Sequence, residues 1–523
     1  MAGDPPPSRG SHKAPSRVAE ASRPFGRSLS DFTPLRPAEQ KLRVACAKGE
    51  LAHITSERPH GCDTKNSVRG SFIRFLALGG DEAAPIHEKG VQLTGAWVEG
   101  PFTLDRCSTC KPLMFWKCEF EEDISMIGAH LLYLNLSDSA IKSFIGDSMT
   151  CQGDVFFRGK FHASGIVRLL GARISGDLSF SNARIEGADG VSIAMDSAEI
   201  GGSVFLNQKF TSMAMIRMHR VTIGAHLLCT SGSFVNKGDI ALALDAAVIR
   251  GALFFRNITL VEGLIALPAT KVESLCDDLN SWPPEIILDG FVYSRIDSGP
   301  TDAESRITWL KHQNPRRYDA IFWPQPWEQA VKVLREMGHT EDARLIAIEK
   351  QRELRRLRVI GNRKPIPRSS RLSRTLEKIW VGFVNLSIRT LHWLYGALAV
   401  YGYRPLRTVA WMGLLWAIAF GVNLWADQQG LFVPKGGQAE VTERVDDGYK
   451  RSSFSPAVFA LDALLPLVDL KQEGDWTPAV ERSDGCTDWA GWWVRALMWV
   501  EILFGWLSSL LLVAAVGRLV QKD

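Results

Sequence analysis

The sequence predicts a mixed fold: a β-helix (β-solenoid) with helical caps, then a helical hairpin, then a C-terminal transmembrane α-helical region. Three observations predict it. A sequence pattern of apolar and small residues recurs between residues 91 and 298. Helical periodicity replaces it after residue 299, and two long apolar segments follow towards the C-terminus. At 523 residues the chain is too long for one compact core, so several structural units are expected.

The first 90 residues predict a leader and a cap. Residues 1–36 are rich in Pro, Ser, Gly and Arg and lack an apolar stretch, which indicates a disordered basic leader without a secretion signal. Residues 37–90 carry two helical patterns, one around Leu42 and one around Phe72. A stack of repeats needs its first coil covered, so we expect this helical pair to form an N-terminal cap.

The repeat domain, residues 91–298, predicts stacked strands. An apolar residue is followed at +2 by Gly or Ala and at +4 by an aliphatic residue or Phe. The starting positions are Val98, Ile127, Cys151, Ile174, Ile200, Ile223, Ile249 and Leu288. Alternating apolar positions place side chains on one face of a strand, and the small residue leaves room for a tight corner. We expect a right-handed β-helix of four-sided coils; an antiparallel β-sandwich is the alternative, which the fixed period disfavours.

A helical hairpin is predicted over residues 299–360. Trp327, Ala330 and Leu334 share one helical face, and Thr340 can cap a second helix. We expect the hairpin to close the C-terminal end of the solenoid, with a partner-binding groove as the alternative.

Residues 361–378 predict a basic juxtamembrane linker, within a basic run that starts at Lys350. Near an anionic membrane surface each basic residue contributes about 1 kcal/mol to attraction. The candidate lipid-binding residues are Arg355, Arg356, Arg358, Arg363, Lys364, Arg368, Arg371 and Arg374. A solvated linker and a nucleic-acid patch are the alternatives; the neighbouring apolar segments favour anionic lipid headgroups, with no nucleic acid.

Two spans are predicted, at residues 405–426 and 490–518, because each approaches the ~20 apolar residues needed to cross a bilayer. Residues 379–404 contain Arg389 and His392, so we expect an interfacial helix there, with a membrane-embedded helix as the alternative. The connecting loop, residues 427–489, is acidic, while Arg404 and Arg407 precede the first span. The positive-inside rule therefore predicts a multi-pass protein of the cell (inner or plasma) membrane. The solenoid and the tail, residues 519–523, would be cytoplasmic.

Three ionisable residues stand in or near the predicted membrane region. A short apolar helix, residues 454–468, is too short to span and contains Asp462, with Asp469 directly after it. Glu501 lies within the second span. An ionisable group there is costly and is by default a functional candidate. The three are candidates for a pore or membrane function; helix capping and interfacial hydration are the alternatives.

The sequence contains no familiar catalytic motif. It contains no dinucleotide fingerprint, phosphate-binding loop, zinc-protease motif or nucleophile elbow, so we expect no catalytic residue and no cofactor. Cys107, Cys110 and Cys118 are weak candidates for a metal site, and ordinary core cysteines are the alternative. The nine Cys lack disulfide-like spacing, which fits a reducing compartment.

Six segments together resemble one family. They are residues 90–96 (GVQLTGA) with the repeats after them, 325–329 (QPWEQ), 334–344 (LREMGHTEDAR), 401–405 (YGYRP), 460–466 (ALDALLP) and 505–507 (GWL). The chain resembles bacterial membrane proteins that join a pentapeptide-repeat-like β-helix to a two-span C-terminal tail. Some members are labelled membrane-associated oxidoreductase, although the sequence shows no flavin, nicotinamide, haem or iron–sulfur motif.

Three functions are consistent with these features. The first is an integral membrane protein that presents a cytoplasmic β-helix as a scaffold for a protein partner. The second is a homo-oligomeric pore-loop channel, although the residues after Pro466 lack a potassium-filter sequence. The third, implied by the family label alone, is a membrane-associated oxidoreductase.

Overall fold

The structure is a computed structural model that describes residues 27–315, 319–364, 371–435, 453–481 and 488–520. The chain forms two compact units, Met1–Ala347 and Ile348–Asp523. The boundary between them falls inside helix α6 (Thr340–Arg356).

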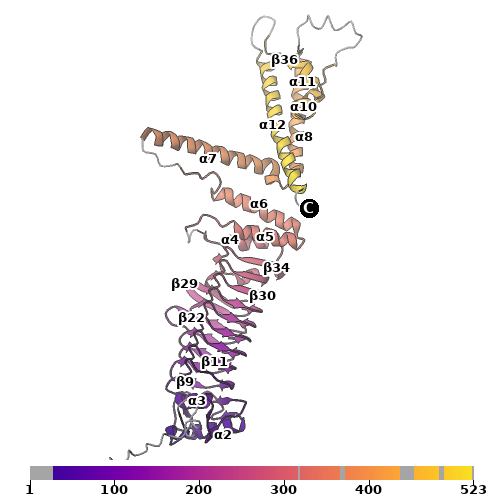
Figure 1. Ribbon diagram of the computed structural model, residues 1–523. Helices are drawn as coiled ribbons and strands as arrows, with labels where there is room; N and C mark the ends of the chain where they lie inside the picture. Colours follow the sequence, from indigo (N-terminus) through magenta and orange to yellow (C-terminus); the bar gives the residue numbers. More distant parts are fainter. Residues whose placement is uncertain (1–26, 316–318, 365–370, 436–452, 482–487, 521–523) are drawn as a thin grey trace, which may run out of the picture. The chain divides into compact units, whose positions relative to one another are not determined.

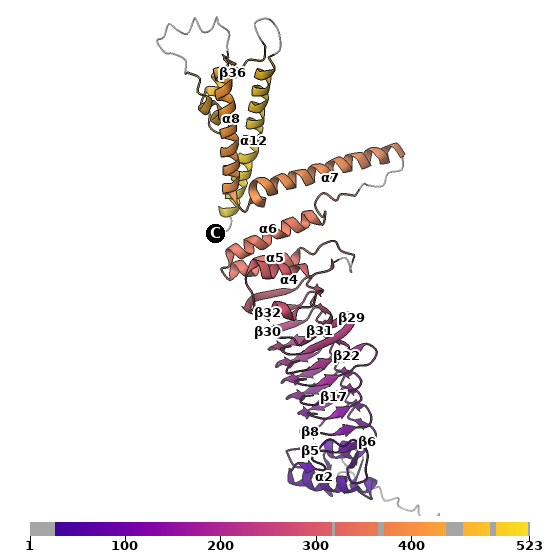
Figure 2. The same ribbon diagram turned by 180° about the vertical axis from the view of Figure 1, so that it is seen from behind.

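The first unit contains a parallel β-solenoid of about nine turns (Figures 1 and 2). Its strands are mostly two residues long and pair with the equivalent strands of the coils before and after, so they stack in four columns. Among the described residues every strand pair between coils is parallel. The antiparallel pairs lie elsewhere: β3 (Gly80–Asp81) with β4 (Ala84–Pro85), β35 (Phe432–Pro434) with β36 (Trp476–Pro478), and a single bridge between Ala188 and Val191 within one coil. The predicted solenoid is therefore confirmed, and the alternative antiparallel sandwich is wrong.

The columns run the length of the stack. The first contains β1 (Ala52–His53), β5 (Val91–Thr94), β8 (Leu113–Trp116), β12 (Leu134–Asn135), β16 (Val155–Phe156), β20 (Leu178–Ser179), β24 (Val204–Phe205), β28 (Leu227–Leu228) and part of β30 (Val248–Phe255). The second contains β11 (His130–Leu131), β15 (Thr150–Cys151), β19 (Arg173–Ile174), β23 (Glu199–Ile200), β27 (Thr222–Ile223) and the rest of β30.

The other two columns meet in β29 (Ser233–Ala243). The third contains β2 (Ser67–Arg69), β6 (Trp97–Glu99), β9 (Glu119–Phe120), β13 (Ala140–Ile141), β17 (His162–Ala163), β21 (Arg184–Ile185) and β25 (Thr211–Ser212). The fourth contains β7 (Phe102–Thr103), β10 (Ile124–Ser125), β14 (Phe144–Ile145), β18 (Val167–Arg168), β22 (Val191–Ala194) and β26 (Met215–Arg217). The last coils continue as β31 (Leu260–Ala266), β32 (Lys271–Asp277), β33 (Ile286–Ile287) and β34 (Val292–Ser298).

The solenoid interior is apolar and stacked from coil to coil. Phe157 and Phe180 lie with ring centroids 5.2 Å apart and planes 9° from parallel. Phe210, Phe234 and Phe255 continue the aromatic series at centroid distances of about 6 Å. One coil cannot bury such a series alone, so the stack itself forms the core.

The recurring pattern of apolar and small residues lies at corners of the coil. From Cys151 to Ile249 the apolar start lies in the second column and the +4 residue in the first. At the corner, a Cβ on Gly176 would lie 2.2 Å from an Asp154 carboxylate oxygen, which explains the small residue. The same Asp154 oxygen accepts the N–H of Asp177 at 2.9 Å, and in the following coil Asp177 accepts the N–H of Ser203 at 2.7 Å.

The eight starts are not structurally equivalent. Val98 lies in β6 of the third column, Ile127 lies in the turn before β11, and Leu288 follows β33. The same apolar-small-apolar spelling therefore serves more than one corner of the coil.

Helices close both ends of the first unit. At the N-terminal end are η2 (Leu29–Phe32), α2 (Pro37–Lys48), α3 (Gly70–Ala77), β3 (Gly80–Asp81) and β4 (Ala84–Pro85). At the other end, η3 (Leu279–Ser281) precedes α4 (Ala303–Lys311) and α5 (Gln325–Glu336). The Gln329 side chain of α5 donates to the Tyr293 carbonyl of β34 at 2.7 Å. Helix α4 was not predicted, because the buried Arg306 interrupts its apolar face.

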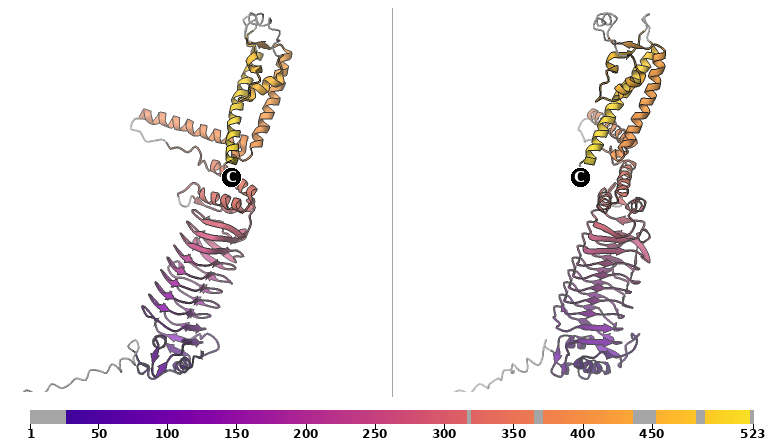
Figure 3. Two further views of the ribbon diagram at one scale, coloured as in Figure 1. Left: turned by 45° about the vertical axis from the view of Figure 1, so that its right-hand side comes forward. Right: turned by 90° about the vertical axis from the view of Figure 1, so that its right-hand side faces the viewer.

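The second unit is helical. After α6 it contains α7 (Arg371–Ala399), η5 (Val400–Gly402), α8 (Pro405–Gln428), β35 (Phe432–Pro434), α10 (Pro456–Leu464), α11 (Gln472–Asp475), β36 (Trp476–Pro478) and α12 (Trp489–Val520). Helices α8 and α12 run side by side, and α10 contacts both (Figure 3). Two segments, Pro405–Gln428 and Trp489–Ala514, are long and apolar enough to cross a membrane.

Candidate functional site

One face of the solenoid carries an outward row of large apolar side chains, which we call the apolar row: Phe156, Phe205, Leu228 and Phe254. They occupy the second strand position of the first column, where strand pairing aligns them one above another, with Ser179 between Phe156 and Phe205. Their neighbours on each strand point into the core and are fully buried, whereas the row is half-buried. The row is thus an apolar stripe on the outer surface.

Cationic side chains lie over two rings of the apolar row. The Arg158 guanidinium carbon lies 4.1 Å from the Phe156 ring centroid, and that of Arg256 lies 5.7 Å from the Phe254 ring. His226 meets Phe254 edge to face at 5.7 Å. Aromatic side chains and Arg are enriched at protein-binding surfaces, so this composition favours a protein partner.

The neighbouring second column differs. Its outward positions, aligned by the same coil-to-coil pairing, are His130, Thr150, Arg173, Glu199, Thr222, Val248 and Lys271. All but Val248 are polar or charged. Stacking therefore does not require an apolar row, because the second column stacks in the same way with polar outward residues.

The apolar row was missed from the sequence, although it leaves a signal. In a strand with one solvated face, apolar and polar residues alternate. Here the runs 155–157 (VFF), 204–206 (VFL), 227–229 (LLC) and 253–255 (LFF) are apolar without alternation. The interruption of the alternation at the same coil position is what marks an apolar outer face.

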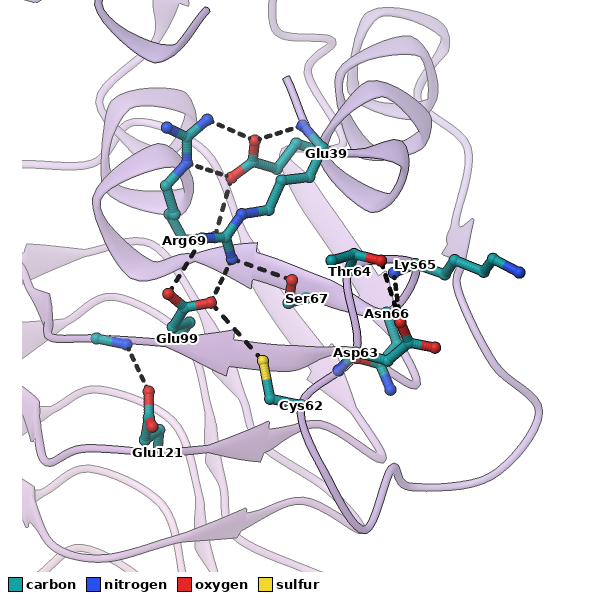
Figure 4. Close-up of polar contacts among 12 residues, drawn as sticks. Glu39, Cys62, Asp63, Thr64, Lys65, Asn66, Ser67, Arg69, Glu99 and Glu121 are labelled. Carbon is teal, nitrogen blue, oxygen red and sulfur yellow. Dashed lines mark hydrogen bonds and ion pairs between the residues drawn. The ribbon is translucent and has the colours of Figure 1, made fainter. Parts of the chain in front are cut away.

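A polar network fastens the N-terminal cap to the first coils (Figure 4). The Glu39 carboxylate of α2 is fully buried and accepts both Nε and Nη2 of Arg69 at 2.7 and 2.6 Å. It also accepts the backbone N–H groups of Arg36 and Arg69. Burial alone would raise the pKa of Glu39, but the hydrogen bonds from Arg69 and the two backbone N–H groups outweigh it and lower that pKa.

Replacing Glu39 with Gln is expected to lower the free energy of local opening of α2 by about 1–3 kcal/mol, because the charge-assisted hydrogen bonds to Arg69 are lost. Because the pKa of Glu39 is lower in the folded state, its ionised carboxylate stabilises the fold above the unfolded-state pKa of about 4.3. This stabilisation is lost as the pH falls through the folded-state pKa. Hydrogen exchange of the α2 amides in the full chain measures both effects. Glu121→Gln is the control, since exposed Glu121 makes one bond to the Gly100 N–H. Equal protection of α2 in both variants would contradict the assignment.

The three cysteines named from the sequence are not brought together as a metal site. Cys118 is buried, and burial raises the pKa of its thiol to about 12, while Cys110 is exposed. The Cys107 sulfur accepts from Arg74 Nη2 at 3.3 Å. Among the residues that the structure describes, no three His, Cys, Asp or Glu side chains are grouped to hold a metal ion.

Asp462 and Asp469 are engaged locally. The Asp462 carboxylate is 6% exposed and accepts the backbone N–H groups of Leu470 and Glu473 at 2.6 and 2.8 Å. It therefore ties the loop after α10 back onto that helix. Asp469 is exposed and accepts from the backbone and side chain of Lys471.

Glu501 is in a different environment. It is 1% exposed, and neither carboxylate oxygen has a hydrogen-bond partner in the described part of the chain. On the same buried face of α12, the Ser508 hydroxyl also lacks one, and so does the Asn423 Nδ2 of α8. A Cβ on Gly505, between them, would lie 2.1 Å from the Leu464 carbonyl of α10. The buried face of α12 thus combines a close approach of α10 with costly unpaired polar groups.

The predicted lipid-binding residues are exposed where the structure describes their side chains. Arg355, Arg356, Arg358, Arg363 and Lys364 are all exposed, and Arg356 pairs with Glu353 at 3.2 Å. Arg368 lies outside the described residues, as do the side chains of Arg371 and Arg374, which begin α7.

Comparison of the chain with protein-family models, curated proteins and solved structures gives no match.

Proposed function

We propose that this chain is a membrane-anchored scaffold: α8 and α12 cross the membrane, and the solenoid presents its apolar row to a protein partner. One observation supports membrane insertion: in the second unit apolar side chains are exposed and polar side chains are buried, the reverse of a soluble protein. Large apolar side chains of α8 and α12 are exposed, including Leu406 at 80% and Leu503 at 71%, whereas Asn423, Glu501 and Ser508 are buried. Only 22% of the most apolar window of each helix is buried, unlike a core helix of a soluble protein.

Charge supports one orientation. Arg404 and Arg407 stand at the start of α8, and between the two spans Asp and Glu outnumber Lys and Arg. The proposal therefore places the solenoid on the cytoplasmic side of the cell membrane. It assigns the chain to the bacterial membrane proteins with a right-handed, pentapeptide-repeat-like β-helix that it resembles in sequence.

Helix α7 is proposed to lie in the plane of the membrane interface. Its large exposed apolar side chains are Leu376, Ile379, Trp380, Phe383, Leu386, Leu391 and Trp393, mostly at helical spacing. Its polar side is occupied within the second unit. Asn385 exchanges two hydrogen bonds with the Arg363 backbone, and Arg389 donates to the Gly361 carbonyl at 3.0 Å. A helix with one apolar and one polar face is suited to an interfacial position.

Membrane extraction tests the anchoring. The full chain should stay in the membrane pellet after alkaline carbonate treatment and leave it only with detergent. A chain that ends at Lys364, and so lacks α7, α8 and α12, should be found in the soluble fraction. Release of the full chain by carbonate would contradict membrane insertion.

Site-specific photo-crosslinking tests the docking surface. A photoreactive residue at Phe205 or Leu228 should crosslink to one common partner, because both positions belong to the apolar row. The matched control is Thr222, an outward residue of the second column in the same coil as Leu228. Equal crosslinking from Thr222 would show that the row has no special role.

A homo-oligomeric pore is the second candidate, favoured by the position of α10. This short helix contacts both α8 and α12, and exposed Leu467 and Val468 follow it. In an oligomer, such a loop would be covered by, or face, neighbouring copies. Ion flux through the protein in liposomes, reduced by Glu501→Gln, would support the pore; oligomers without flux would exclude it.

A further inference from the structure

A basic, aromatic-walled pocket lies inside the second unit, where the end of α6 and the α7–α8 junction meet. It has a volume of about 210 Å³, and its lining includes Arg352, Arg355, Arg407, Trp393, Val400 and Tyr401. The charged lining groups are all arginines. They come from α6 and α8, so the fold gathers them from positions more than fifty residues apart in sequence.

The arginines retain capacity for an anion. Arg352 pairs with Glu349 at 3.1 Å. Neither Arg355 nor Arg407 has a carboxylate partner among the residues that the structure describes, and both are exposed. The pocket therefore carries an excess of positive charge, and the guanidinium group presents forked donors that match phosphate oxygens.

The turn between α7 and α8 lines part of the pocket. Val400 and Tyr401 take left-handed backbone conformations, with φ of 47° and 56°, which turns the chain sharply between α7 and α8. Tyr401 is 4% exposed, and its ring lies so close to Gly396 that a Cβ there would be 2.6 Å from it. The Thr408 hydroxyl donates to the Leu398 carbonyl at 3.2 Å across the same junction. A non-glycine residue at positive φ is costly, so this turn is maintained by its packing.

The pocket also adjoins apolar surface. Trp393, at its edge, is 54% exposed and belongs to the exposed apolar side of α7. A ligand with a phosphate group and an attached acyl chain could place the phosphate against the arginines and the chain along α7.

We propose that this pocket binds a phosphate group, and that its source is the headgroup of an anionic phospholipid such as phosphatidylglycerol. The inference rests on the proposed membrane anchoring, because α7 and α8 bring the pocket to the bilayer surface. It goes beyond general attraction of a basic linker, since it assigns binding to Arg355 and Arg407 rather than to every basic residue nearby.

The test compares two charge-matched double variants of the full chain in lipid nanodiscs. Arg355→Gln with Arg407→Gln removes two pocket charges, and Lys378→Gln with Arg404→Gln removes two exposed charges that do not line the pocket. All four side chains are exposed, so folding should be unaffected, as thermal unfolding can check. Native mass spectrometry counts phosphatidylglycerol retained per chain from discs that mix it with phosphatidylcholine.

The parent and the control variant should retain phosphatidylglycerol, while the pocket variant should bind it about tenfold more weakly for each charge-assisted bond lost. Calorimetric titration of inorganic phosphate into phosphatidylcholine discs separates the sources: tight binding there, abolished in the pocket variant, would retain the phosphate site but overturn the lipid assignment. An equal loss of phosphatidylglycerol from both variants, or no phosphatidylglycerol retained by the parent chain, would contradict the proposed binding site. A chain that fails to enter phosphatidylcholine discs would instead contradict the membrane anchoring.

Discussion

Replacing Arg306 with Met is expected to destabilise the C-terminal end of the solenoid by about 3–5 kcal/mol, the cost of leaving one partner of a buried ion pair uncompensated. Arg306 of α4 and Asp277 of β32 are both completely buried and form two parallel hydrogen bonds of 2.8 Å. Asp277 also accepts from the Trp282 indole at 2.9 Å, and Arg306 Nε donates to the Pro300 carbonyl at 2.7 Å. Without the guanidinium, the Trp282 indole is the one side-chain donor left to the Asp277 carboxylate within the described part of the chain.

Hydrogen exchange of the β32 and β34 amides measures this loss in the full chain. The control is Arg295→Met, because Arg295 pairs with Asp297 on the surface, where ion pairs contribute at most about 1 kcal/mol. Changing both buried partners, Arg306→Met with Asp277→Leu, should restore part of the stability, since no isolated charge remains. If Arg306→Met and Arg295→Met exchange alike, the buried pair does not hold α4 to the last coils.

Placing Arg at position 503 is expected to reduce membrane insertion of α12 by about 2.5–3.5 kcal/mol, the value for a charged residue at the centre of a span. Leu503 lies near the middle of the apolar segment Trp489–Ala514 and is 71% exposed. If its surroundings are hydrocarbon, the new guanidinium has no water or partner there. The insertion efficiency of α12 in microsomes, read from glycosylation of sites on either side, measures the change.

Leu467→Arg is the matched control for that substitution. Leu467 is 76% exposed but lies in the loop after α10, outside both apolar helices. Its replacement should leave insertion of α12 unchanged. Unchanged insertion in Leu503→Arg as well would indicate that the exposed surface of α12 faces water or another protein.

The solenoid could be predicted from the sequence because its stacking leaves a periodic record. Inward residues must be apolar and corner residues such as Gly176 must be small in coil after coil, so the pattern repeats with the structure. The two membrane-length helices were predictable for a similar reason, since a span needs an uninterrupted apolar segment.

The candidate surfaces were harder to predict, because they depend on residues that only folding brings together. The Arg306 pair joins β32 to an unpredicted helix, and the buried Arg looks like a surface residue in sequence. The pocket combines Arg355 of α6 with Arg407 of α8, and their approach depends on the turn at Tyr401. Phe205 and Phe254 form a row only once the coil register is known.

The central claim is that the exposed apolar surface of α12 lies in hydrocarbon, and the depth of residue 503 tests it most directly. A fluorescent bimane on Leu503→Cys, in a chain whose reagent-accessible native cysteines are replaced by Ser, is reconstituted in liposomes. We expect strong quenching by lipids brominated near the middle of the acyl chain and little quenching by aqueous iodide. Strong iodide quenching without quenching by brominated lipid would contradict the membrane-anchored account.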